Sequence, residues 1–231
     1  MRIKAITLTL IIAGCFFSGF AQKMKAPEKV KLENDIDSVS YSFGLMVAKN
    51  LLLQDIDNVN FDAFKLGFYH MMAGKKEKIS LEDAHITIQS YIDGMRKEEA
   101  RNNLEEGKKF LEENRNEPGV VELSSGLQYK VIESGDGKSP KANDIVKVHY
   151  HGTLLDGTVF DSSVERGKPA ILNVGGVIKG WQEALKLMRT GSKWTLYIPP
   201  ELAYGESGAG EDIGPNSTLI FEVELLEIME K

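Results

Sequence analysis

The chain has 231 residues, of which 42% are hydrophobic and 27% are charged. This composition is typical of a soluble globular protein with one or two domains, and it is too apolar for a disordered chain. The formal net charge is −6, and a net-acidic chain without a basic cluster is a poor partner for nucleic acid. The single cysteine, Cys15, excludes an internal disulfide framework and any cysteine-based zinc or iron–sulfur cluster.

The first 21 residues have the pattern of a secretory signal peptide. Residues 1–4 are short and basic, and residues 5–20 are almost wholly apolar but shorter than the roughly 20 residues of a membrane-spanning helix. Two processing sites are open: cleavage between Ala21 and Gln22, or a lipobox-like sequence that leaves Cys15 acylated. Loss of Arg2 and Lys4 leaves 26 positive and 34 negative charges, a net charge of −8. Both alternatives predict export to the periplasm, the second as a membrane-anchored lipoprotein.

Residues 30–117 have a helical texture without proline. Apolar residues at helical spacing predict one helix over 36–53 and a second over 61–73, the second after Asn60 as an N-cap. The apolar residues of these two helices include Phe43, Leu45, Met46, Leu51, Phe61, Phe64, Phe68 and Met71. So small a unit cannot bury that surface alone, which predicts that residues 30–117 form a homodimerisation domain.

A third helix is predicted from Leu81 to Arg115, after Ser80, which has capping-box spacing with Asp83. Its apolar stripe ends at Met95, and 13 of the 22 residues over 96–117 are charged, six positive and seven negative. Mixed charge of this kind indicates a solvated helix, about 50 Å long at 1.5 Å per residue. The segment is either a charged linker or a stiff arm that holds two functional units apart.

Residues 122–231 have the texture of strands and turns. Alternating runs at 127–132, 145–151, 194–198 and 219–225 predict strands, and Asp156-Gly157 is a hairpin signal. One helical segment, 178–188, lies among them. Antiparallel strands around one short helix predict an α+β domain, preceded by the all-α region and the long connecting helix.

Motifs for cofactor or metal chemistry are missing from the sequence. His149 and His151 point the same way from a predicted strand, but no third ligand has matching spacing, so they are interpreted as a solvated sheet face. The glycines over 205–214 are not followed by the Lys-Ser/Thr of a phosphate loop, and the Gly-x-Ser-x-Gly of serine hydrolases does not occur. The sequence therefore predicts no cofactor and no metal.

Five motifs occur in order between Leu127 and Met229. They are Val148-His149-Tyr150-x-Gly152, Asp156-Gly157-x-x-Phe160-Asp161-Ser162-Ser163, Val177-Ile178-x-Gly180-Trp181, Ala203-Tyr204-Gly205 and Leu219-x-Phe221-x-Val223-x-Leu225. Together they resemble the FKBP-type peptidyl-prolyl cis–trans isomerases. The resemblance implies a half-wrapped antiparallel sheet around the short helix, with a ligand cavity between them.

The resemblance also implies roles for ten residues. Asp161, Tyr204, Ile178 and Trp181 would be catalytic: Trp181 forms the floor, Ile178 N–H and the Tyr204 hydroxyl bind substrate carbonyls, and Asp161 lies near the twisting imide. The substrate-binding residues would be Tyr150, Phe160, Arg166, Val177, Ile213 and Phe221. The expected partners are X–Pro segments of folding polypeptides. The alternative is a non-catalytic periplasmic chaperone with a vestigial isomerase pocket.

Two positions depart from the family pattern. Ala170 and Ala209 stand where many members carry a larger, often aromatic, side chain, so the pocket is expected to be wider, and binding of a macrolide inhibitor is open. Lys168-Pro169-Ala170 and Ile213-Gly214-Pro215-Asn216 are more similar to the exported macrophage infectivity potentiator-like subclass. That subclass has a helical N-terminal dimerisation domain and a long connecting helix, which residues 30–117 resemble.

Overall fold

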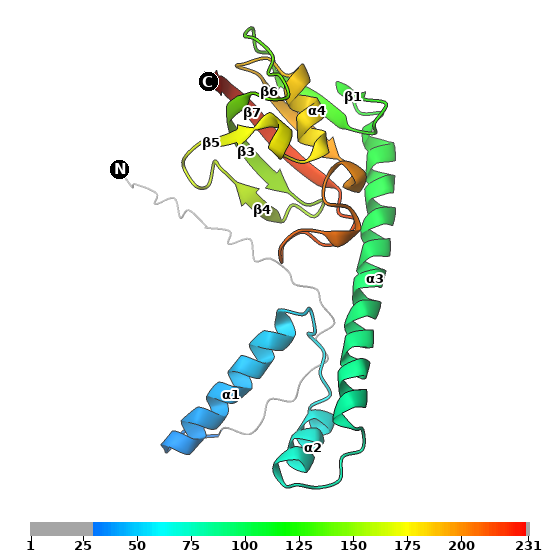
Figure 1. The fold of residues 1–231 in the computed structure, drawn as a ribbon, viewed down its shortest axis with the longest axis vertical. Helices are drawn as coiled ribbons and strands as arrows, with labels where there is room; N and C mark the ends of the chain where they lie inside the picture. Colours follow the sequence, from blue (N-terminus) through cyan, green and yellow to red (C-terminus); the bar gives the residue numbers. More distant parts are fainter. Residues whose placement is uncertain (1–29, 230–231) are drawn as a thin grey trace, which may run out of the picture. The chain divides into compact units, whose positions relative to one another are not determined.

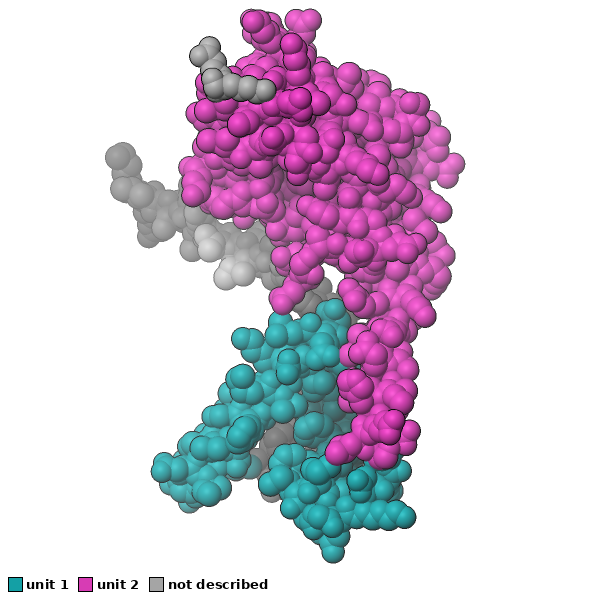
Figure 2. Space-filling model, viewed as in Figure 1, with its two compact units in different colours: residues 1–79 teal, residues 80–231 magenta. Residues whose placement is uncertain are grey.

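The computed structural model describes residues 30–229 (Figure 1). The chain divides into two compact units, Met1–Ile79 and Ser80–Lys231 (Figure 2). Both predicted processing sites, at Cys15 and Ala21, lie outside the described residues. Within residues 30–229, no helix combines the length and the apolar character needed to cross a bilayer.

The first unit contains α1 (Asp35–Leu52) and α2 (Phe61–Met72). The first and last residues of both helices agree with the sequence prediction to within one residue. The side chains of Asn34 and Asn60 cap the two helices by accepting backbone N–H groups of their first turns, which satisfies donors that have no partner inside a helix. Neither helix contains a buried residue, so the apolar faces of this unit are open along its length.

The second unit begins with the 34-residue helix α3 (Leu81–Asn114). Ser80 Oγ accepts the N–H of Asp83 at 3.0 Å and donates to its carboxylate at 2.7 Å. The expectation of a solvated helix is wrong for one face, because Gly107 and Asn114 are buried. Small and polar side chains on that face lie against the sheet domain, and hydropathy does not detect them.

A seven-stranded antiparallel sheet follows α3 in the second unit, in the order β1-β2-β6-β7-β3-β4, with β5 also paired to β3 (Figure 1). The strands are β1 (Val120–Glu122), β2 (Gln128–Glu133), β3 (Ile145–Thr153), β4 (Val159–Ser162), β5 (Ala170–Asn173), β6 (Lys193–Ile198) and β7 (Leu219–Met229). One edge of β3 pairs along its whole length with β7, while the other edge pairs first with β5 and then with β4. Tyr150 therefore lies on β3 between the part that pairs with β5 and the part that pairs with β4.

The core lies between the sheet and α4 (Lys179–Leu187). Trp181, Ala184 and Leu185 of α4 are buried against the sheet. A Cβ added to Gly180 would come within 2.6 Å of Ile198 Cγ2, so only glycine lets the helix lie this close to β6. Three short 3-10 helices complete the unit: η1 (Val174–Gly176), η2 (Pro200–Leu202) and η3 (Gly205–Ser207). The predicted α+β architecture, with one short helix packed on an antiparallel sheet, is confirmed.

Candidate active site

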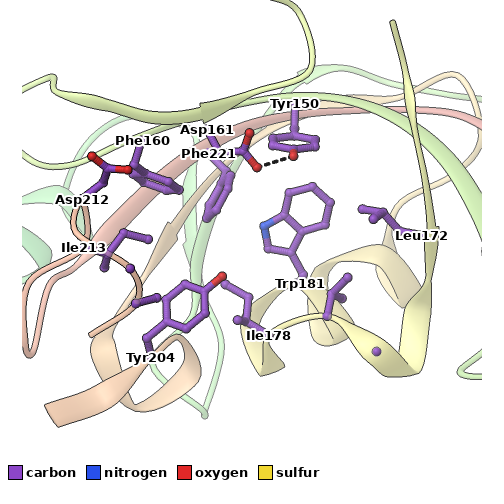
Figure 3. Close-up of a pocket in the computed structure, with 14 residues that line it drawn as sticks. Tyr150, Phe160, Asp161, Leu172, Ile178, Trp181, Tyr204, Asp212, Ile213 and Phe221 are labelled. Carbon is purple, nitrogen blue, oxygen red and sulfur yellow. Dashed lines mark hydrogen bonds between the residues drawn. The ribbon is translucent and has the colours of Figure 1, made fainter. Parts of the chain in front are cut away.

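A cavity of about 500 Å³ opens between β3, β4, the start of α4 and the segment between β6 and β7 (Figure 3). Its lining comprises Tyr150, Phe160, Asp161, Leu172, Gly176, Val177, Ile178, Trp181, Tyr204, Ala209, Gly210, Asp212, Ile213 and Phe221. Nine of the ten residues named from the sequence are among these. The tenth, Arg166, lies beside the cavity and binds Asp161.

Aromatic rings form the floor and one wall of the cavity. The indole of Trp181 is 3% exposed, and the rings of Tyr150 and Phe221 meet it edge-on, with centroids 5.4 and 5.2 Å away. Phe160 packs edge-on against Phe221 at 5.3 Å. Such edge-to-face pairs are favourable beyond their buried area and hold the rings in fixed orientations.

Glycine at position 152 makes this ring cluster possible. A Cβ there would approach Phe160 Cζ to 2.7 Å and Phe221 Cε1 to 2.8 Å, far inside normal carbon contacts. Gly152 lies on β3 between β4 and β7, and it pairs with Asp161 on one side and with Phe221 on the other. Steric contact with the two rings thus explains why the Val148–Gly152 motif ends in glycine.

Three polar side chains form a closed set of hydrogen bonds at the edge of the ring cluster. The Tyr150 hydroxyl donates to the Asp161 carboxylate (Figure 3), and Arg166 Nη1 donates to the same carboxylate. Arg166 Nη2 donates to Tyr150 Oη at 2.8 Å, and the guanidinium carbon lies 5.5 Å from the centre of the Tyr150 ring. Asp161 therefore accepts two hydrogen bonds. Hydrogen bonds to an ionised carboxylate are stronger than hydrogen bonds between neutral groups.

The triad shifts the proton affinities of its members. Burial raises the pKa of Asp161, but the hydrogen bonds from Tyr150 and Arg166 together outweigh burial and hold that pKa below its ordinary value. Burial and the hydrogen bond to Asp161 raise the pKa of Tyr150 above its ordinary value. At neutral pH the carboxylate is consequently ionised, and the phenol keeps its proton.

Two further hydrogen-bond donors belong to Ile178 and Tyr204, which line the cavity. Ile178 immediately precedes α4, and Gln182 Nε2 fixes the chain there by donating to the carbonyl of Val177 at 2.7 Å. Among the residues described, neither the Ile178 N–H nor the Tyr204 hydroxyl donates to a protein group. In Figure 3 the Tyr204 phenol lies on the side of the indole opposite to Leu172. Both donors are free for a ligand.

Several lining residues were missed by sequence reasoning. Leu172 comes from β5, a four-residue strand in which residues 170 and 172 are partly buried while 171 and 173 are exposed; the sequence Ala-Ile-Leu-Asn does not alternate in polarity, so hydropathy did not mark Leu172. Gly176 ends the three-residue helix η1, and Gly210 and Asp212 lie in the loop before β7; neither a single short turn nor a loop has a periodicity that marks a residue facing a cavity. Ala209 was singled out only as a departure from the family pattern.

The two histidines of β3 have serine partners. His149 Nδ1 lies 3.1 Å from Ser163 Oγ, and His151 Nδ1 lies 3.0 Å from Ser162 Oγ. Ser163 Oγ also accepts the backbone N–H of Tyr150 at 2.7 Å, which fixes the end of β4 beside the cavity. Residues 30–229 contain no cluster of three side chains with the spacing of a metal site.

Comparison with protein families gives two matches that together span most of the chain. Residues 136–226 match the family described as FKBP-type peptidyl-prolyl cis-trans isomerase. Residues 36–131 match the family described as the domain amino terminal to FKBP-type peptidyl-prolyl isomerase. The first match contains every residue of the cavity, and the second contains α2, α3 and all of α1 except its first residue, Asp35.

Individual relatives align over nearly their whole length. The chain is 47% identical to the FKBP-type 22 kDa peptidyl-prolyl cis-trans isomerase of Escherichia coli strain K12, over 82% of this chain and 94% of the relative. It is 40% identical to the outer membrane protein MIP of Legionella longbeachae, over 96% and 97%. The crystal structure of FkpA from Escherichia coli superposes with a TM-score of 0.69 at 37% identity, over 86% of this chain and 98% of that one.

Proposed function

The chain belongs to the FKBP-type peptidyl-prolyl cis–trans isomerases, and we propose that it isomerises X–Pro bonds of exported polypeptides in the cavity above Trp181, as a homodimer joined through α1 and α2. The observation that carries the proposal for the site is the cavity itself. It gathers an aromatic floor, an ionised carboxylate and two unpaired donors from five separate segments.

The reaction needs no nucleophile, which suits these side chains. Rotation about the bond faces a barrier of ~18–20 kcal/mol because amide resonance must be broken, and the uncatalysed step takes tens to hundreds of seconds. A twisted imide has lost its resonance and carries less charge on its oxygen than the planar form. A dry aromatic cavity therefore disfavours the planar ground state more than the twisted transition state, which is differential binding.

The polar groups are proposed to orient the substrate. Ile178 N–H and the Tyr204 hydroxyl would donate to carbonyl oxygens of the polypeptide on either side of the proline. Asp161 would lie near the twisting imide, with its orientation fixed by Tyr150 and Arg166. The pyrrolidine ring would occupy the space over Trp181, where it meets ring faces and edges instead of water.

Exchange spectroscopy on a short X–Pro peptide tests these roles in the full chain. Trp181→Ala and Asp161→Ala should each slow isomerisation at least about tenfold, because misplacing a bound substrate has costs of that order or more. Glu165→Ala is the matched control: it removes an exposed carboxylate four residues from Asp161 and should leave the rate unchanged. Full activity of both site variants, with native circular dichroism, would contradict the assigned roles.

The proposed homodimer is supported by the surface of the first unit. A groove of about 970 Å³ is lined by α1, α2 and the intervening chain, mostly by apolar side chains. Phe43, Phe64 and Phe68 line it and are 68%, 44% and 61% exposed. Soluble monomers rarely present such contiguous apolar surface, and a second copy offers a surface of the same chemistry to cover it.

Two adjacent residues of α2 give a matched test of that interface. Phe68 lines the groove, whereas Tyr69 is 54% exposed and does not. Sedimentation of the full chain at micromolar concentration should give a dimer, Phe68→Lys should give a monomer, and Tyr69→Lys should stay dimeric. A monomeric parent, or a dimeric Phe68→Lys variant, would contradict assembly through this face.

Export and a role in folding exported clients complete the proposal. The basic and apolar pattern of residues 1–20 supports export, and intact-mass measurement of the secreted or membrane fraction distinguishes a chain beginning at Gln22 from one acylated at Cys15. Two cavities in one dimer could bind one unfolded client together, which raises avidity without new contacts and supports a chaperone activity beside the isomerase. Refolding yields of a proline-containing protein, with parent and Phe68→Lys compared, measure that contribution.

We also propose that a macrolide inhibitor would occupy the same cavity. Ala209 lines it, and its small side chain leaves room at the loop. Inhibition of peptide exchange that is competitive with the substrate supports this, whereas binding without inhibition contradicts it.

A further inference from the structure

The second half of α3 presents a regular stripe to the sheet domain. Counting from Ala100, buried or half-buried residues recur three or four positions apart, while the residues between them are exposed. The stripe comprises Ala100, Asn103, Leu104, Gly107, Phe110, Leu111 and Asn114. Four of its seven members are small or polar, so this face is built for close approach and hydrogen bonding more than for apolar burial.

The first part of the stripe contacts one loop, residues 214–218, that leads into β7. Asn103 Nδ2 donates to the carbonyl of Pro215 at 2.8 Å, and Asn216 Nδ2 donates to the carbonyl of Ala100 at 3.3 Å. A Cβ added to Gly107 would lie 2.3 Å from Thr218 Oγ1, so the helix backbone lies directly against the loop. Figure 1 shows the segment between β6 and β7 running beside α3.

The same loop is continuous with the wall of the cavity. Ile213, which is 8% exposed and lines the cavity, directly precedes Gly214 and pairs with Ala209 through two backbone hydrogen bonds of 2.9 and 3.2 Å. The N–H of Asn216 donates at 2.8 Å to the carbonyl of Gly205, the residue after Tyr204. The loop residues Gly214, Pro215 and Asn216 thus connect α3 to Ile213 and to the segment that contains Tyr204.

Asn216 connects the two sides of this arrangement. Its φ is +55°, in the left-handed region that non-glycine residues rarely occupy and that asparagine tolerates best. The backbone N–H points to the Tyr204 segment while the side chain binds α3. A backbone conformation that is unfavourable for a non-glycine residue persists only when the surrounding contacts hold it in place. The hydrogen bond from Asn216 to α3 is one of these contacts.

We propose that α3 belongs to the isomerase site, with Asn103 as a positioning residue that acts through residues 214–218 on Ile213 and Tyr204. The inference rests on the proposed substrate contacts of Ile213 and Tyr204. It assigns to α3 a role beyond spacing or dimer formation: the helix fixes the wall of the cavity that faces the proline.

Adjacent asparagines provide a matched pair of variants in the full chain. Asn103→Ala removes the donor to Pro215, whereas Asn102→Ala removes an exposed amide one position away on the same helix. We expect kcat/KM for a short X–Pro peptide to fall about fivefold in Asn103→Ala, the effect of losing one positioning hydrogen bond, and to stay unchanged in Asn102→Ala. The assay is run well below the unfolding transition of each variant, which circular dichroism establishes.

A double-mutant cycle with Ile213→Ala separates positioning from a general loss of stability. If Asn103 acts through the loop, the double variant should lose little more kcat/KM than Ile213→Ala alone, because the wall is already disrupted. Additive losses, or parental kcat/KM in Asn103→Ala beside a clear defect in Ile213→Ala, would overturn the inference. An inactive parent or a fully active Ile213→Ala would instead overturn the proposed site, so the two failures are distinguishable.

Discussion

Two glycines of α3 should respond differently to the same substitution. Gly94 and Gly107 are both interior to the helix, where alanine is favoured over glycine by about 1 kcal/mol. A Cβ at Gly94 would meet nothing within 4 Å, whereas a Cβ at Gly107 would come 2.3 Å from Thr218 Oγ1. Gly94→Ala should therefore stabilise by up to ~1 kcal/mol, and at Gly107 an overpacking cost of ~1–3 kcal/mol should cancel or exceed the gain.

Removing Thr218 Oγ1 should restore that gain. The oxygen is buried without a hydrogen-bond partner among the residues described, so Thr218→Ala alone should be nearly neutral, because an unsatisfied buried hydroxyl contributes no net stability. In the double variant the nearest remaining atom, Thr218 Cβ, lies 3.3 Å from the new Cβ, and Gly107→Ala should become tolerated.

Urea unfolding followed by tryptophan fluorescence measures these changes in the second unit, since both tryptophans, Trp181 and Trp194, lie there. If Gly107→Ala stabilises as much as Gly94→Ala, the close contact between α3 and the loop does not exist in solution.

Three further predictions follow from the cavity and its triad. Because the pKa of Asp161 is held below its ordinary value of 3.8, the stability that its ionised form contributes is fully present above that pH and is lost as the pH falls through the lower folded pKa. The difference in unfolding free energy between parent and Asp161→Asn should thus be constant from pH 7 to pH 5 and shrink only below 3.8; a loss centred near pH 6 would refute the triad. Gly152→Ala should reduce isomerase activity more than stability, measured as kcat/KM and as urea midpoint, because its Cβ would collide with Phe160 and Phe221 at 2.7 and 2.8 Å. Tyr150→Phe should lower activity and raise the pKa of Asp161, which NMR titration of the carboxyl carbon detects, because one of its two donors is lost.

Long alternating runs predicted the strands that hold the core, and short ones escaped. β3, β6 and β7 have six to eleven residues, enough for the period of two to emerge. β1, β4 and β5 have three or four and take their conformation from the strands they pair with. The resemblance identified the cavity better than periodicity did, because its residues come from five segments that no local pattern connects.

The stripe of α3 that packs against the sheet domain was not predicted from the sequence, and the reason is physical. Hydropathy detects burial through large apolar side chains, whereas this face uses Asn103 for a hydrogen bond and Gly107 for close approach. Thirteen charged residues in the same stretch occupy the other faces and dominate the average. The spacing of Leu104 and Leu111, one heptad apart with Gly107 between them, was the available signal for a buried stripe.

The protonation state of the triad limits what Asp161 can do in the reaction. A carboxylate whose pKa is depressed, and which already accepts hydrogen bonds from Tyr150 and Arg166, has no proton to donate at neutral pH and little tendency to accept one. Acid–base catalysis by Asp161 is therefore disfavoured, and it is not needed, because rotation about an imide transfers no proton. What remains is electrostatic: a fixed negative charge at the edge of an apolar cavity, where field effects are stronger than in water. The same carboxylate holds the Tyr150 ring edge-on to Trp181, so we infer that its removal would disturb both the charge and the shape of the cavity at once.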